Sequence, residues 1–124
     1  GAFVSDIYGI DTKGEKVYMA RLHSMLSTSH SYQTVKLFKI KGNSIKDAKL
    51  FKTNSGLTNL LSFEFNFFSV VDRNERPIKL FEYDAKTKTL KFPVVVEDTK
   101  FPNGRVTDKF IKYKFNGVYF VKVK

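Results

Sequence analysis

The side chains that could carry out covalent or metal chemistry are few in this sequence. It contains no cysteine, which excludes disulfides, thiolate zinc sites and cysteine nucleophiles. Its two histidines, His23 and His30, lie seven residues apart and have no acidic or imidazole partner at the spacing of metal ligands. We therefore predict no metal site and no bound cofactor. His23 is expected to be a strand residue with an ordinary hydrogen bond, and His30 a loop residue.

Nucleophile motifs and paired acids are not evident either. The sequence has no Gly-x-Ser-x-Gly, phosphate-loop or His-Glu-x-x-His motif, and residues 24–31, where serines gather, are typical of a loop. A glycosidase would need two carboxylates facing one another across a cleft. Several acids are available, but no spacing pairs two of them: Glu64, Glu82, Asp84, Glu97, Asp98 and Asp108. We expect surface ion pairs and predict that the protein is not an enzyme.

Residues 72–77, Asp-Arg-Asn-Glu-Arg-Pro, concentrate opposite charges directly after a phenylalanine-rich segment. Two interpretations are open. The guanidinium groups of Arg73 and Arg76 could bind a carboxylate or phosphate through paired hydrogen bonds. Alternatively, Asp72 or Glu75 pairs with one of these arginines and caps the turn, and we favour this structural interpretation.

The formal net charge of +10 favours an anionic partner such as nucleic acid, anionic lipid or acidic polysaccharide. The lysines, however, recur in nearly every strand-like segment, at Lys36, Lys39, Lys41, Lys86, Lys88, Lys91, Lys109, Lys112 and Lys114. Because they alternate with apolar residues, we interpret them as the solvent faces of strands. Lysine in such positions also protects exposed strand edges from pairing with other chains.

The elements that must position these residues are β-strands. Phenylalanine and tyrosine, at 13 and 6 residues, suit half-buried pleated surfaces. Leu61, Phe63, Phe65 and Phe67 alternate with polar residues and predict the clearest amphipathic strand. Turn residues separate the strand-like segments 1–15, 17–26, 32–41, 45–53, 61–67, 78–83, 89–96, 106–115 and 118–124. Residues 17–26 are also compatible with helix, and 44–49 with a helical turn.

A run of hairpins with about seven to nine strands predicts an antiparallel meander. At 124 residues the chain is expected to form a single all-β domain, 1–124, with one core. The meander would close as a small barrel or a two-sheet sandwich, and the sequence does not separate these. No apolar run approaches the ~20 residues of a membrane-spanning helix, so no transmembrane segment is expected.

Asn116 and Gly117 predict a two-residue type I′ turn between the last two strands. If Phe115 faces Val118 across this turn, the core face comprises Ile111, Tyr113, Phe115, Val118 and Phe120. The reverse face then carries a mixed basic and aromatic surface made of Lys112, Lys114, Tyr119, Val121 and Val123. Another strand could pack on this surface, or a ligand could bind to it, and both possibilities stay open.

Aromatic side chains offer two kinds of binding surface. Tyr8, Tyr32 and Tyr119 are of the type that stacks on sugar rings, although each is equally compatible with packing. A basic β-barrel that binds single-stranded nucleic acid would stack bases on its aromatic side chains, and the candidates are Phe110, Lys112, Lys114 and Tyr119. We rank nucleic acid below a protein or glycan partner, because most phenylalanines fall on the inferred core face.

Two stretches of the chain resemble a known group of proteins. Residues 69–77, Ser-Val-Val-Asp-Arg-Asn-Glu-Arg-Pro, with Tyr83-Asp84 and 87–90, resemble uncharacterised small exported all-β domains of anaerobic gut-type bacteria. The segment 113–120, Tyr-Lys-Phe-Asn-Gly-Val-Tyr-Phe, is similar to the way in which such domains end. The resemblance implies an envelope location and a binding or accessory role, and it transfers no functional residue.

Together these patterns predict a non-enzymatic, exported binding or accessory domain for a protein partner or a glycan, in the periplasm or at the cell surface. The start at Gly1 without an initiator methionine is consistent with a removed targeting segment. The alternative function is a basic β-barrel that binds single-stranded nucleic acid. The expected ligand-binding residues are Arg73, Arg76, Lys112, Lys114 and Tyr119.

Overall fold

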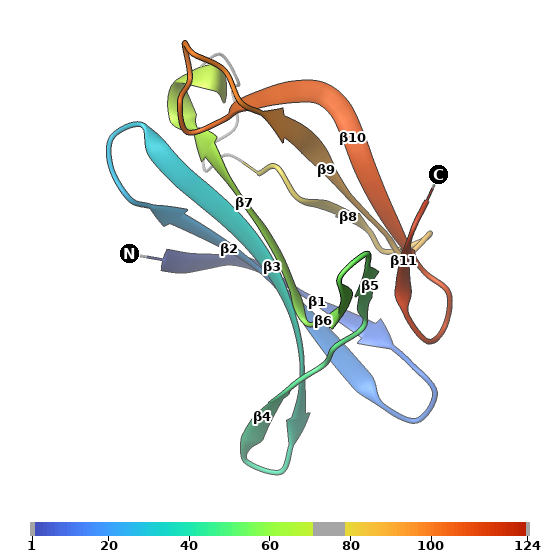
Figure 1. Cartoon of the computed structure of the whole chain (residues 1–124). Coiled ribbons are helices and arrows are strands. Elements are labelled where there is room, and N and C mark those ends of the chain that lie inside the picture. Colours follow the sequence, from blue (N-terminus) through green and yellow to red (C-terminus); the bar gives the residue numbers. More distant parts are fainter. Residues whose placement is uncertain (1, 71–78, 124) are drawn as a thin grey trace.

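The computed structural model describes residues 2–70 and 79–123 (Figure 1). Within these residues the chain forms eleven strands and one short 3₁₀ helix, η1 (Phe67–Val70). The all-β prediction is confirmed. The strands are more numerous than expected because one expected segment is divided into two strands and because β6 (Gly56–Thr58) lies between two expected segments. Residues 45–53, for example, contain parts of both β4 (Ser44–Asp47) and β5 (Phe51–Thr53), and 44–49 form no helical turn.

The first sheet has five strands. β1 (Ala2–Asp11), β2 (Lys16–Met25), β3 (His30–Lys41) and β4 lie in this order, each antiparallel to the next. β7 (Leu60–Asn66) pairs with the first part of β3, also antiparallel. The segment 17–26, which was also compatible with helix, therefore forms a central strand with a paired neighbour on each side.

The second sheet has six strands, in the order β6-β5-β11-β10-β9-β8. Their bounds are Gly56–Thr58 for β6, Phe120–Lys122 for β11, Arg105–Phe115 for β10, Thr89–Val96 for β9 and Glu82–Asp84 for β8. All neighbours are antiparallel except β11 and β5, which are parallel. Hydrogen bonding among the described strands thus gives two sheets and no single closed barrel.

Both sheets contribute side chains to one buried cluster, so the core lies between them. The first sheet provides Ile10, Val17, Met19, Val35 and Leu37. The second sheet provides Phe51, Leu90, Tyr113, Phe115 and Phe120. The burial of alternate residues on these strands is the expected result of a period of two, which turns one face of each strand to the core.

The predicted alternation of β7 is confirmed over most of its length. Leu61, Phe63 and Phe65 face the buried Val35, Gln33 and Ser31 of β3, and Phe65 is fully buried. Phe67 falls outside the strand because the chain turns into η1 there. It still packs against a second, smaller buried cluster of Phe65, Val70 and Leu80.

The C-terminal hairpin forms as predicted, but the predicted register is wrong by two residues. Phe115 faces Phe120, not Val118. The turn is longer because the side-chain oxygen of Asn116 accepts hydrogen bonds from the main-chain N–H groups of Val118 and Tyr119, at 2.9 and 2.8 Å. A shift of two residues preserves the faces, so Tyr113, Phe115 and Phe120 are buried as expected, whereas Val118 is exposed.

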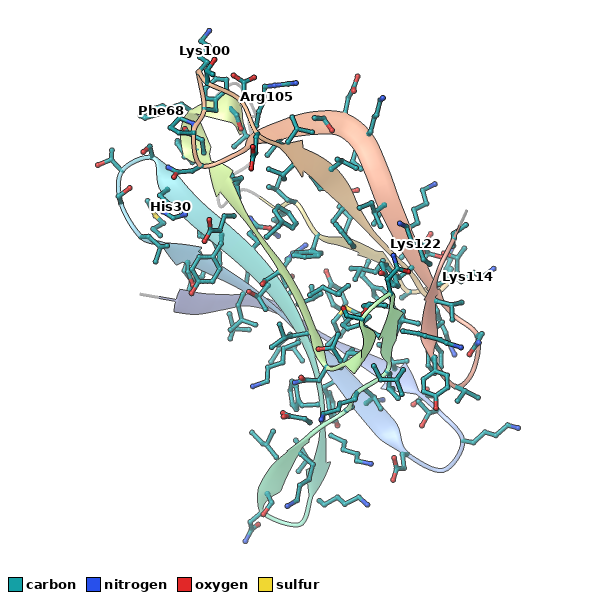
Figure 2. The ribbon with its side chains drawn as sticks, in the orientation of Figure 1. His30, Phe68, Lys100, Arg105, Lys114 and Lys122 are labelled. Carbon is teal, nitrogen blue, oxygen red and sulfur yellow. The ribbon has the colours of Figure 1, made fainter. Side chains whose placement is uncertain are left out.

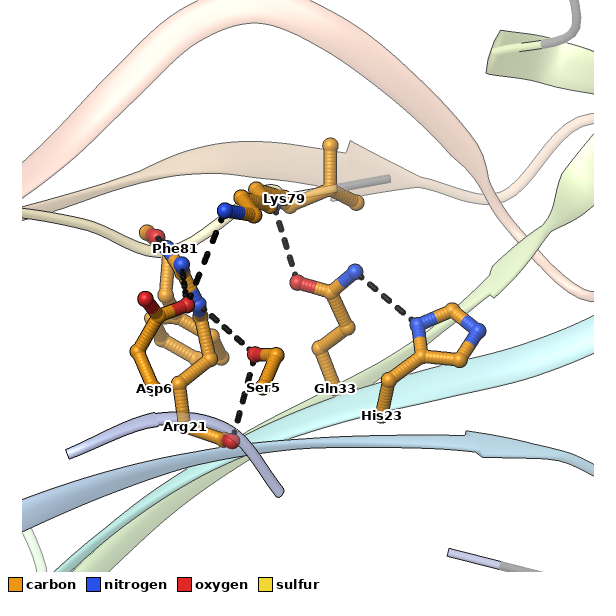
Figure 3. Close-up of polar contacts among 8 residues, drawn as sticks. Ser5, Asp6, Arg21, His23, Gln33, Lys79 and Phe81 are labelled. Carbon is orange, nitrogen blue, oxygen red and sulfur yellow. Dashed lines mark hydrogen bonds and ion pairs between the residues drawn. The ribbon is translucent and has the colours of Figure 1, made fainter. Parts of the chain in front are cut away.

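Polar side chains on the inner face of the first sheet hold the segment that leads into β8 (Figure 3). Arg21 donates a hydrogen bond to the main-chain oxygen of Phe81. Gln33 Oε1 accepts from the N–H of Leu80 at 2.9 Å, and Gln33 Nε2 donates to His23 Nδ1 at 3.1 Å. The interpretation of His23 as a hydrogen-bonded strand residue is therefore confirmed, and residues 80 and 81 are fixed across the core.

The other histidine does not lie in a loop, as the sequence suggested. His30 is the first residue of β3, and its Nε2 lies 3.3 Å from a carboxylate oxygen of Glu64 on the neighbouring β7. Figure 2 shows His30 at the end of the first sheet. The small polar run 27–29 before it forms the loop, and pairing with β7 extends the strand back to His30.

Candidate functional site

An open groove of about 550 Å³ lies over the outer face of β8, β9 and β10. It is lined by Glu82, Tyr83, Asp84, Thr87, Thr89, Lys91, Lys112, Lys114 and Val123. Lys112 and Lys114 alternate along β10 with the buried Tyr113 and Phe115, so strand geometry turns both ammonium groups outward. Lys114 is visible on this strand in Figure 2.

Sheet register places like charges opposite one another in this groove. Lys112 of β10 faces Lys91 of β9, and Lys91 in turn faces Glu82 of β8. Lys114 and Asp84 both flank Thr89 in the next row. Like charges directly opposite on one face of an antiparallel pair are destabilising. The free protein therefore concentrates positive charge here at a cost to its own stability.

Among the described residues, only one of these three lysines has a carboxylate partner. Lys91 Nζ lies 3.2 Å from Glu82 Oε2 and 4.5 Å from the centre of the Phe110 ring. Within residues 2–70 and 79–123, no carboxylate lies within ion-pair distance of Lys112 or Lys114. These two ammonium groups remain available to an anion from solution.

The acids of the groove are held by the β8–β9 hairpin. Asp84 Oδ1 accepts hydrogen bonds from the N–H groups of Lys86 and Thr87, at 2.9 and 3.4 Å, which shapes the turn. Lys88 adopts a φ of 52°, a left-handed conformation that closes the same turn. Burial first, and then the charge of Asp84, raises the pKa of Tyr83, so its hydroxyl stays neutral at pH 7.

Two of the six acids considered for hydrolysis thus line one groove, but their geometry differs from that of a glycosidase. Glu82 and Asp84 lie two residues apart on the same strand, side by side. A glycosidase needs carboxylates on opposite sides of the scissile bond. One of the two pairs with Lys91 and the other shapes a turn. Both acids are suited to accept hydrogen bonds from hydroxyl groups.

The structure describes three of the five predicted ligand-binding residues, and two of these three line the groove. Lys112 and Lys114 are brought together in the groove. Tyr119 lies in the β10–β11 turn, half-buried, and does not line the groove. Arg73 and Arg76 lie outside the described residues.

The aromatic residues considered for sugar stacking do not form one surface. Tyr8 packs toward the core against Tyr83, with ring centres 5.2 Å apart. Tyr32 lies opposite Ser24 in the first sheet, and Tyr119 lies in a turn of the second. Phe110, considered for nucleic acid, lies two residues from Lys112 on β10 and is 49% exposed. It is therefore the accessible aromatic ring beside the groove.

The interpretation of lysine as an edge-protecting residue is wrong for most of the strands. Among the described edge strands, β1, β6, β7 and β8 contain no lysine, and only β4 has one, Lys46. Most lysines of the described strands lie on β3 and β10, with three each, and both strands have neighbours on both sides, as does β9 with Lys91. Protection against pairing therefore does not explain the row formed by Lys91, Lys112 and Lys114.

Sequence reasoning missed Lys91, Glu82 and the two threonines as parts of one site. The β8–β9 hairpin itself was predicted, so a local signal for Glu82 beside Lys91 existed. The alignment of Lys91 with Lys112 depends on the β9–β10 register, which shifts between Val106 and Phe110. Pro93, in the middle of β9 and opposite Phe110, was the local signal for this irregularity, because proline inside a central strand occurs mainly at bulges.

Other kinds of site are not found in the part of the chain that is described. No group of three or more potential metal ligands gathers there. No helix among these residues is long and apolar enough to cross a membrane. A second groove of about 310 Å³ lies near the β1–β2 turn, but Glu15 there pairs with Lys39 at 3.3 Å and Lys41 at 3.7 Å.

Known protein families, curated proteins and solved structures were each compared with the chain, and none of the three comparisons found a match. The function must therefore be inferred from the charge and geometry of the groove.

Proposed function

We propose that this protein is a non-enzymatic binding or accessory domain that holds an anionic glycan on the outer face of β8, β9 and β10. The observation that carries the proposal is the facing pair Lys91 and Lys112, with Lys114 beside it and, among the described residues, only one carboxylate paired with the three. Rules of strand pairing are broken most often where function requires it. A bound carboxylate or sulfate group would relieve the repulsion.

A glycan suits the groove better than a flat polyanion would. Its volume of about 550 Å³ lies within the usual range for small-ligand sites. The ammonium groups would bind uronate or sulfate groups, and Glu82, Thr87 and Thr89 provide hydrogen-bonding partners for sugar hydroxyls. An acidic protein segment is the other partner expected from the sequence, and it would use the same lysines.

The proposal also covers the architecture of the domain and its location in the cell. We take the domain to be a two-sheet sandwich, which the shared core cluster supports. The resemblance to exported domains supports a location in the periplasm or at the cell surface. Fractionation of cells that produce the native protein tests this location, and recovery from the cytoplasm would contradict it.

Calorimetric titration with short oligosaccharides tests the binding function. A uronate-containing or sulfated oligosaccharide is expected to bind, and the neutral parent sugar is expected to bind much more weakly. Replacing both Lys112 and Lys114 by Gln should weaken binding at least about tenfold, or ~1.4 kcal/mol. Lys46→Gln is the matched control, because Lys46 also faces a lysine, Lys39, but lies outside the groove. Equal loss in both variants, or no binding by the wild type, would refute the proposal.

Single-stranded nucleic acid is the second candidate, and the exposure of Phe110 beside Lys91 and Lys112 favours it. Base stacking on an aromatic ring contributes roughly 1–3 kcal/mol per base. If the ligand is nucleic acid, Phe110→Ala should weaken the binding of a homopolymeric oligonucleotide and leave glycan binding intact. Absence of oligonucleotide binding at low salt would eliminate this candidate.

A further inference from the structure

The outer face of the second sheet continues beyond the groove, from β10 across β11 to β5 (Figure 1). Lys114 of β10 lies opposite Val121 of β11, and Val121 lies opposite Lys52 of β5. Residues directly opposite one another in paired strands share one face of a sheet. Lys52 therefore projects from the same face as Lys114, whereas Phe120 and Phe51, at the neighbouring positions, are buried in the core.

The charge in this half of the sheet is positive and uncompensated. Neighbouring strands lie ~4.8 Å apart, so the main chains of Lys52 and Lys114, two strands apart, are separated by about 10 Å. β5, β6 and β11 contain no acidic residue. Lys52 is exposed, and no carboxylate of the described residues pairs with it. Its ammonium group is therefore a second free cation in line with the groove.

Apolar side chains lie between and beside these lysines. Val123, which lines the groove, is 44% exposed, and its N–H donates to Lys112 O at 2.8 Å, which keeps the segment after β11 beside β10. Val121 is half-buried, and Leu57 of β6, opposite Lys52, is 46% exposed. Cations thus alternate with accessible apolar surface from the groove to β6, and this combination suits a chain of sugar rings that carry acidic groups.

We propose that the ligand is a linear polyanionic glycan that crosses the strands, with one acidic group at Lys112 and Lys114 and the acidic group of a later sugar at Lys52. This inference rests on the proposed function of the groove and adds a second subsite to it. Glu82 and Asp84 lie at the β8 side of the groove and would repel an anionic chain. The glycan therefore extends the other way, toward β5.

A glycan fits this extension better than a single-stranded nucleic acid does. Nucleic acids gain affinity by stacking bases on aromatic rings. The row from Lys114 through Val121 and Lys52 to Leu57 contains no aromatic residue. Valine and leucine can instead contact the C–H groups of sugar rings. Nucleic acid is therefore treated as a contrary outcome of the test.

Calorimetric titration with a disaccharide and an octasaccharide of one uronate polymer tests the second subsite. The octasaccharide should bind the wild type more tightly, because its second contact is intramolecular once the first has formed. Lys52→Gln should weaken octasaccharide binding about threefold to fivefold, the usual range for the loss of one exposed ion pair, and leave disaccharide binding unchanged.

Lys122→Gln is the matched control. It removes the same charge from the neighbouring β11, but Lys122 lies opposite the buried Tyr113 and so projects from the other face of the sheet. This variant should bind both oligosaccharides like the wild type. Equal weakening in the two variants would show a general effect of net charge and would overturn the proposal, as would unchanged octasaccharide binding by Lys52→Gln.

The failure of the second subsite differs from the failure of the groove. If neither oligosaccharide binds the wild type, the proposed function itself is wrong. If both bind through Lys112 and Lys114 without any contribution from Lys52, only the second subsite is refuted. Dependence on Lys52 for an oligonucleotide but not for the octasaccharide would assign this face to nucleic acid.

Nuclear magnetic resonance of the wild type gives a check that needs no variant, should Lys52→Gln fail to fold. The main-chain amide signals of Lys52 and Leu57 should shift on addition of the octasaccharide and stay in place with the disaccharide. Shifts confined to β8, β9 and β10 with both oligosaccharides would contradict the extended site.

Discussion

At the scale of single residues, buried polar side chains on the inner face of the first sheet show how this core tolerates charge. Arg21 is 5% exposed and is satisfied by Asp6, by Ser5 Oγ at 3.0 Å and by the main-chain oxygen of Phe81. Burial alone would raise the pKa of Asp6, but the hydrogen bond and charge of Arg21, with that of Lys79, lower it overall. The buried charge is therefore paired, as stability requires.

His23 makes stability depend on pH. Burial lowers its pKa below the ordinary value, so the unfolded chain binds a proton at higher pH than the folded protein. The free energy of unfolding should therefore fall as pH decreases below about 6.5 toward the folded pKa. Urea unfolding at neutral pH and at about pH 5 measures this loss.

His23→Gln is the informative variant for this prediction. Glutamine retains an oxygen that can accept from Gln33 Nε2 but does not titrate. Its loss of stability over the same pH interval should be smaller than that of the wild type. An equal loss in both proteins would assign the pH dependence to carboxylates instead.

At the scale of elements, the close approach of β7 and the β9–β10 loop joins the two sheets. Asn66 N–H donates to Gly104 O, and Ser69 Oγ accepts from the N–H of Val106 at 3.3 Å. The hydrogen bonds of residues 80 and 81 join the sheets at a second place. These contacts complement the hydrophobic core, because they fix the relative position of strands that share no ladder.

Gly104→Ala should be strongly destabilising. Gly104 has a φ of 119°, and a Cβ there would lie 2.6 Å from Val95 Cγ1 and 3.2 Å from the main-chain oxygen of Glu64. Backbone strain and overpacking together should cost roughly 2–4 kcal/mol. Chemical denaturation measures the change.

Comparison with Gly56→Ala separates backbone strain from packing in the effect of Gly104→Ala. Gly56 has nearly the same φ, 120°, but a Cβ there meets nothing within 4 Å. Its loss of stability should reflect strain alone and be clearly smaller than that of Gly104→Ala. Equal losses would mean that the contact with β7 contributes little.

At the scale of the whole molecule, the net charge of +10 acts on stability as well as on binding. Lysines on the outer faces of central strands repel one another in the free protein. Raising the salt concentration screens this repulsion. The free energy of unfolding should therefore increase with ionic strength. A protein stabilised mainly by surface ion pairs would show the opposite trend, a decrease.

The expected increase in the free energy of unfolding is about 1 kcal/mol between low salt and roughly 0.5 M sodium chloride. Thermal unfolding monitored by circular dichroism measures it. Replacing Lys112 and Lys114 by Gln should reduce the salt effect, whereas Lys46→Gln should reduce it less, because it removes one positive charge instead of two neighbouring ones. A salt effect that is identical in all three proteins would place the repulsion elsewhere.

The sequence by itself determined the class of the fold and the faces of its strands. Alternation along β10 turned Lys112 and Lys114 outward and Tyr113 and Phe115 inward, and this held although the hairpin register was wrong by two residues. Whether a side chain faces the core or the solvent depends on the period of two within its own strand, which is a local property. For the same reason the Asn116 turn and the amphipathic β7 could be recognised directly.

Only the tertiary structure decided which strands became neighbours. Lys91 lies opposite Lys112 because the β9–β10 ladder shifts register, and Lys52 lies in line with Lys114 because β11 pairs with β5 as well as with β10. Pairing between distant segments is selected by the burial of the whole core and not by local propensity. The basic groove and its continuation to Lys52 both result from that selection, which is why neither could be located from residue patterns alone.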